Sequence, residues 1–161
     1  AVPTSLRRQM DVDGRSMPVQ LWVLDWDSAA LITDVFRIIA EEVVGFETVI
    51  GATAKSSSSR SMPRALSGCA NPEEEPPDNG LPCAINSGFS EYHVGFEAWE
   101  SIFMDLFYEL QRAFPQMANE LLGEVGYTGH EGMFLTDRVQ VHALGTAGIA
   151  LDYYRSYNTS W

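Results

Sequence analysis

The distribution of apolar residues predicts a strand, a helix and a second strand in the first third of the chain. Residues Val19–Trp26 are β-rich with apolar side chains on both faces, which is typical of a buried parallel strand. Apolar residues then recur at helical spacing, and Gly45 is expected to end this helix in the left-handed conformation. A second strand over Phe46–Ile50 completes a right-handed βαβ unit. The apolar positions of the helix are Leu31, Val35, Ile38, Ile39 and Val43.

Strand and helix patterns also alternate later in the chain. Tyr92–Trp99 is a third strand candidate, followed by a strongly amphipathic helix over Glu100–Phe114 that Pro115 ends. A further helix is predicted over residues 136–144, and a last helical pattern covers Ala147–Tyr157. The fold class is therefore α/β, with a mostly parallel sheet flanked by helices.

The segment before the first strand differs from the rest. Residues 1–18 lack hydrophobic periodicity and are predicted to form a flexible N-terminal arm. Residues 19–161 contain neither an internal repeat nor a dividing linker, so a single α/β domain is expected. No apolar run is long enough for a transmembrane segment.

The charge balance narrows the classes of partner. The 161 residues include 22 Asp and Glu against 10 Lys and Arg, a net charge of −12. Such a chain repels phosphate backbones and anionic lipid surfaces. Nucleic acid is therefore not an expected partner.

The two cysteines bracket a segment that lacks an apolar face of its own. Residues 70–82 contain four prolines and four acidic residues. A Cys69–Cys83 disulfide would staple this acidic loop, removing loop entropy worth ~3 kcal/mol for a loop of about 15 residues; two unrelated buried thiols are the alternative. A disulfide favours an extracytoplasmic location, whether secreted, periplasm-like or in a thylakoid lumen. The cysteine pattern does not suggest a zinc site.

The sequence offers little for catalysis. It contains neither a nucleotide-binding glycine fingerprint nor a nucleophile elbow. His93 and Glu97 share a face of the predicted strand, but a hydrogen-bonded structural histidine is the stronger interpretation than a metal ligand. We expect a protein that is not an enzyme, with no catalytic residues, no metal and no cofactor.

The tryptophans suggest a binding site. Trp26 and Trp99 fall at ends of predicted strands, where ligands of open α/β sheets collect, and Asp25 lies beside Trp26. Two tryptophan faces would hold a quaternary ammonium group by cation–π attraction. The alternative is that they belong to the core or to a protein interface, and Trp22 would simply lie beneath Trp26.

Four segments in this order resemble the glycine betaine/choline-type substrate-binding proteins of ABC transporters. They are the strand Val19–Trp26, the helix ending at Gly45, the segment His93–Trp99 and the glycine-rich Gly126–Leu135. The insertion between the cysteines resembles eukaryotic, microalgal versions. The resemblance extends from Val19 to about Tyr157.

The resemblance implies a type 2 periplasmic-binding fold, in which two α/β lobes close on a ligand without performing chemistry. Here it implies one lobe, with the second partial or absent. Trp26 and Trp99 would be the cage residues, with Asp25 or Glu97 beside them. The ligand would be glycine betaine or another small zwitterion.

A second hypothesis is a repurposed accessory subunit of a larger extracytoplasmic or thylakoid-lumenal, photosynthetic membrane-protein assembly. Met133 stands where the family usually presents an aromatic side chain, and the chain is shorter than usual members. The arm at residues 1–18 and the C-terminal aromatics would then contact protein partners. These aromatics are Tyr153, Tyr154, Tyr157 and Trp161.

Overall fold

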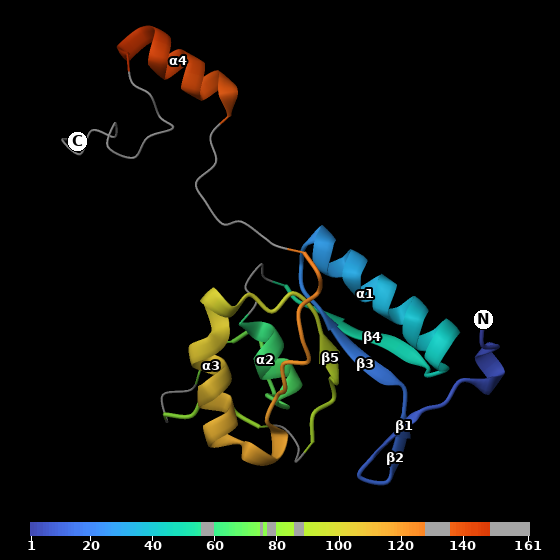
Figure 1. Ribbon diagram of the computed structural model, residues 1–161. Coiled ribbons are helices and arrows are strands. Elements are labelled where there is room, and N and C mark those ends of the chain that lie inside the picture. Colours follow the sequence, from blue (N-terminus) through green and yellow to red (C-terminus); the bar gives the residue numbers. More distant parts are fainter. Residues whose placement is uncertain (56–59, 75, 77–79, 86–88, 128–135, 149–161) are drawn as a thin grey trace. The chain divides into compact units, whose positions relative to one another are not determined.

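A computed structural model describes most of the chain in two compact units, Ala1–Val125 and Gly126–Trp161. The described residues are 1–55, 60–74, 76, 80–85, 89–127 and 136–148 (Figure 1). Within them, no helix combines the length and the hydropathy needed to cross a membrane.

The first unit is built on a three-stranded parallel sheet in the order β4-β3-β5. The central strand β3 spans Val19–Val23, and its neighbours are β4 at Thr48–Thr53 and β5 at Val94–Gly95. Gly51 is the extra residue of a bulge in β4, because Leu21 pairs with Ile50 and the next residue of β3 pairs with Ala52. The α/β prediction is confirmed at this level, although the third strand is far shorter than the predicted Tyr92–Trp99.

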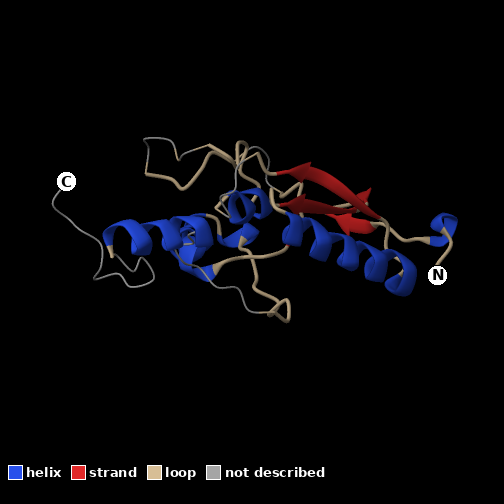
Figure 2. Ribbon diagram, turned by 90° about the horizontal axis from the view of Figure 1, so that it is seen from above, coloured by secondary structure: helices blue, strands red, loops and turns tan. Residues whose placement is uncertain are grey.

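Helix α1 (Asp27–Ile39) follows β3 and runs along the sheet (Figure 2). A π-helical turn, η2 (Ala40–Val44), extends it, and Gly45 ends it with a φ of 83° as predicted. Small side chains face the sheet, with Ala29 and Thr33 buried. The large apolar side chains that give the helix its periodicity are instead exposed: Leu31, Val35, Ile38, Ile39 and Val43.

Helices α2 (Ser61–Leu66) and α3 (Glu100–Ala113) complete the first unit. Helix α2 contacts β3, β5 and α3. Its residue Met62 packs in the main core cluster with Trp22 of β3. On α3, the predicted apolar face is confirmed as buried, and its members are Phe103, Leu106, Phe107 and Leu110. A short 3-10 turn, η3 (Pro115–Met117), follows.

The first 18 residues, for which the sequence predicts a flexible arm, have defined contacts. They include a 3-10 turn, η1 (Thr4–Leu6), and the hairpin β1 (Met10–Val12)–β2 (Arg15–Met17). Between turn and hairpin, the Arg7 guanidinium pairs with the carboxylates of Glu41 and Glu42. The arm is therefore fastened to η2, the turn that extends α1, by ion pairs across 34 and 35 residues of sequence.

The predicted Cys69–Cys83 disulfide is present, with the two Cα atoms 5.7 Å apart. It belongs to a second core cluster with Leu106 and Leu110 of α3. The guanidinium of the buried Arg64 donates a hydrogen bond of 2.7 Å to the carbonyl oxygen of Glu74. The acidic loop is thus attached to both α2 and α3.

The second unit contains helix α4 (Asp137–Ala147), which ends at Gly148 with a φ of 63°. The prediction of a helix over residues 136–144 is confirmed. The pattern over Ala147–Tyr157, the C-terminal aromatics and Met133 lie outside the described residues.

Candidate functional site

Two tryptophans occupy equivalent places in the first unit. Trp26 is the residue before α1, and Trp99 is the residue before α3. Helix α1 follows strand β3, and α3 follows β5, the parallel neighbour of β3. Because both connections leave the same edge of the sheet, the structure brings the two predicted cage segments to one place, the usual ligand site of open α/β sheets.

A direct hydrogen bond joins these two segments. The indole nitrogen of Trp26 donates to the Oε2 atom of Glu97. Glu97 is only 4% exposed, and its φ of 59° lies in the left-handed region that non-glycine residues rarely adopt. A buried carboxylate in a strained backbone conformation is typical of a position held for function.

Ring packing distinguishes the tryptophans. Trp22 is buried and meets the Tyr92 ring edge-on, with centroids 4.9 Å apart, which confirms the core alternative for this residue. In the described chain, ring contacts do not include Trp26 or Trp99. Asp25, the fourth predicted site residue, is exposed beside Trp26.

The two helices that start here also contribute electrostatically. Helices α1 and α3 have 13 and 14 residues, so each carries a substantial dipole. Neither Trp26 nor Trp99 caps its helix through a side-chain hydrogen bond. The positive end of each dipole lies at this edge of the sheet, where it would stabilise an anionic group, and Asp27 already places one carboxylate in the first turn of α1.

His93 has a structural role. Its Nδ1 atom accepts a hydrogen bond of 2.9 Å from the backbone N–H of Gln20, and the backbone N–H of His93 donates to the carbonyl oxygen of Gln20. Burial lowers the pKa of His93 below its ordinary value of 6.5. Among the described residues, no group of three or more metal-ligating side chains is present. The two hydrogen bonds with Gln20 are those expected of a structural histidine.

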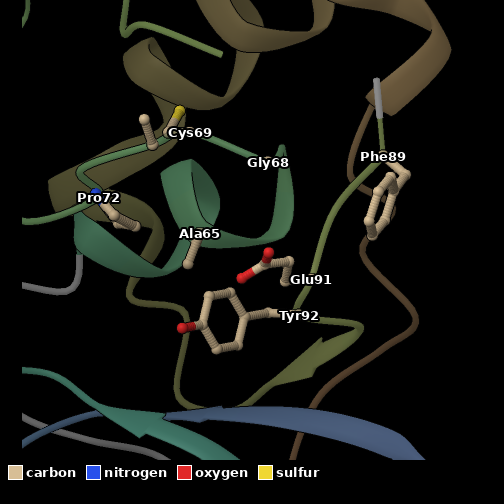
Figure 3. A pocket seen from close by; sticks show the side chains of 8 residues that line it. Ala65, Gly68, Cys69, Pro72, Phe89, Glu91 and Tyr92 are labelled. Carbon is tan, nitrogen blue, oxygen red and sulfur yellow. The ribbon is translucent and has the colours of Figure 1, made fainter. Parts of the chain in front are cut away.

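Two hollows are lined by neither Trp26 nor Trp99. One of about 60 Å³ lies beside Cys69 and is lined partly by Phe89, Glu91 and Tyr92 (Figure 3). Burial, and secondarily the Glu91 carboxylate, raise the pKa of Tyr92. This space accommodates only a few water molecules, well short of a usual ligand pocket.

The second hollow is open and has a volume of about 580 Å³. It lies between the acidic loop and the end of α3, where Pro82, Glu109 and Arg112 line it. It contains none of the predicted site residues.

Sequence reasoning missed the way in which Glu97 acts. It placed Glu97 beside the cage, whereas the structure shows its carboxylate bound to the Trp26 indole. Strand alternation also suggested a shared face for His93 and Glu97, but β5 ends at Gly95 and the backbone of Glu97 is left-handed. The residues around Glu97 contain no sequence pattern that predicts a left-handed backbone conformation for a glutamate.

Comparison of the chain with protein-family models, with curated proteins and with solved structures finds no match. The class that the structure itself defines is a mixed α/β protein with a small parallel sheet flanked by helices and a disulfide-bonded loop.

Proposed function

We propose that the chain is a non-enzymatic binding domain for a small zwitterion with a quaternary ammonium group, such as glycine betaine. The proposal includes a lobe of the type 2 periplasmic-binding fold, related to the binding components of ABC transporters. The observation that supports it is the placement of Trp26 and Trp99 before two helices at one edge of the sheet, with the Trp26 indole bound to Glu97, two residues before Trp99.

Each group would have a distinct part in binding. The indole faces of Trp26 and Trp99 would attract the methylated cation, an interaction worth about 0.5–2 kcal/mol per ring. The hydrogen bond from the indole nitrogen to Glu97 fixes the orientation of the Trp26 ring. Asp25 adds negative charge beside the ring, and the amides at the starts of α1 and α3 would attract the carboxylate of the zwitterion.

Titration calorimetry with glycine betaine, choline and dimethylsulfoniopropionate tests this proposal. We expect saturable binding of at least one of them, and Trp26→Ala and Trp99→Ala should each weaken it by about two- to thirtyfold. Trp22→Phe is the matched control, because Trp22 belongs to the core. Glycine, which lacks the methyl groups, should bind poorly. Absence of heat from all three ligands at millimolar concentration would reject the proposal.

The second candidate function is that of an accessory subunit in a larger extracytoplasmic or thylakoid-lumenal assembly. The observation that favours it is the exposed apolar surface of α1. The Cys69–Cys83 disulfide fits an oxidising compartment. Gentle gel filtration of a source extract with immunodetection tests it: elution at hundreds of kDa supports the subunit role, and elution near the chain's own 17.8 kDa contradicts it.

A further inference from the structure

The outward side of α1 carries a continuous apolar row. Leu31, Val35 and Ile38 follow one another at spacings of four and three residues, and Leu31 and Ile38 are 67% and 60% exposed. Ile39 extends the exposed row on one flank. Spacings of four and three define the seam along which two helices pack. Since the small side chains of α1 already face the sheet, this row is available to a further element.

The opposite flank of the row is acidic. Asp27 and Asp34 lie seven residues apart and therefore on the same side of the helix. Arg37 pairs with Asp34 at 3.2 Å, yet the Asp34 side chain remains 61% exposed. In packed helix pairs, the residues that flank the apolar seam determine which partner and which orientation are accepted.

These flanks disfavour a second copy of the chain. In an antiparallel pair, like flanks meet, so Asp34 of one copy would approach Asp34 of the other. In a parallel pair, the acidic flank would be desolvated against the apolar flank that contains Ile39. Each copy also carries a net charge of −12. The charges of this surface therefore favour a partner of different composition over a second copy.

We propose that the outer face of α1 binds an amphipathic helix of a partner protein. That helix presents an apolar row to Leu31, Val35 and Ile38 and a row of Lys or Arg to Asp27 and Asp34. This inference rests on the second candidate function, in which the chain is a subunit, and specifies how it would be attached.

Two designed peptides test the inference. Each is a stapled helix of about 14 residues, which the staple keeps helical in water, with leucine along one face. One carries Lys on the flank of that face, and the other carries Glu. By fluorescence anisotropy, we expect the Lys peptide to bind with a Kd on the order of 10 µM and the Glu peptide to bind at least about tenfold more weakly.

Variants of the chain separate the apolar and the charged contributions. Val35→Ser/Ile38→Ser should abolish binding of both peptides, and Leu122→Ser, at an 86% exposed position elsewhere in the first unit, should leave it unchanged. Asp27→Asn/Asp34→Asn should remove most of the preference for the Lys peptide. Circular dichroism verifies that every variant remains folded.

Three results would overturn the inference. They are absence of saturable binding of the Lys peptide to the folded chain, binding that survives Val35→Ser/Ile38→Ser, and a dimer in sedimentation velocity that this same double change dissolves. The last result would assign the face to a second copy. If the peptides fail while the native chain elutes in a large assembly, the subunit role stands and only the helix partner is rejected.

Discussion

At the scale of single residues, Glu97 is a position where substitution should lower the stability of the fold. It is buried, its backbone is left-handed, and its carboxylate accepts the Trp26 indole N–H. Glu97→Ala removes the acceptor, so we expect the free energy of unfolding to fall by about 1–3 kcal/mol. Glu97→Gln keeps an acceptor oxygen and should lose less than half of that amount. Urea denaturation followed by tryptophan fluorescence measures both; equal losses in the two variants would contradict a role for the hydrogen bond.

His93 predicts a pH dependence. Burial lowers its pKa in the folded state, so the fold favours the neutral ring whose Nδ1 accepts from Gln20. The stability it contributes is present above the unfolded-state value of 6.5 and is lost as the pH falls through the lower pKa of the folded state.

Unfolding free energies measured between pH 7 and pH 5 test this expectation. The decline should be shallower in His93→Gln than in the unchanged chain. Identical slopes in the two proteins would show that His93 does not contribute.

The sequence alone was enough to select the tryptophans of the candidate site, but it did not predict the hydrogen bond between Trp26 and Glu97. The proposed cage positions, Trp26 and Trp99, come from tryptophans at the ends of predicted strands, which can be read from the sequence. The Trp26–Glu97 hydrogen bond joins residues 71 positions apart, and it depends on β5 lying next to β3. Such a pairing is a property of the tertiary fold, so periodicity could not predict it.

At the scale of elements, α1 shows how periodicity identifies a helix without identifying its buried side. The apolar positions correctly predicted the helix, but the sheet contacts its small residues instead. Helix α3, in contrast, buries the side that its pattern indicates.

The orientation of α1 can be tested with two neighbouring alanines. Ala29 is buried and Ala30 is exposed, so Ala29→Leu should lower the free energy of unfolding by about 1–3 kcal/mol through overpacking. Ala30→Leu should change it by no more than about 0.5 kcal/mol. Chemical denaturation of both variants gives the comparison, and a reversed order would mean that the helix faces the other way.

At the scale of the whole molecule, the disulfide joins the acidic loop to the core beside α3. Cys69→Ser/Cys83→Ser should lower the free energy of unfolding by ~3 kcal/mol, the loop-entropy value for about 15 residues. Calorimetry of the variant and of the reduced chain should give matching decreases in Tm. An unchanged Tm would show that the loop is held by other contacts, such as that of Arg64.

The α/β class and the disulfide were predictable at this scale because both follow from local composition and order. The contacts of residues 1–18 were not. They depend on ion pairs between Arg7 and carboxylates more than 30 residues away, and on the Arg15 guanidinium, which lies 4.4 Å from the centre of the Phe89 ring. Nothing in the sequence around Arg7 or Arg15 indicates which distant residue each will contact.

Those contacts also impose an order on biosynthesis. A ribosome makes the chain from its amino end, so residues 1–18 emerge before Glu41, Glu42 and Phe89, to which they are fastened. Residues 1–18 therefore gain these contacts only after the residues that follow them have been made. Until Phe89 has left the exit tunnel, the hairpin of the nascent chain lacks the contact between Arg15 and the Phe89 ring and is open to proteases.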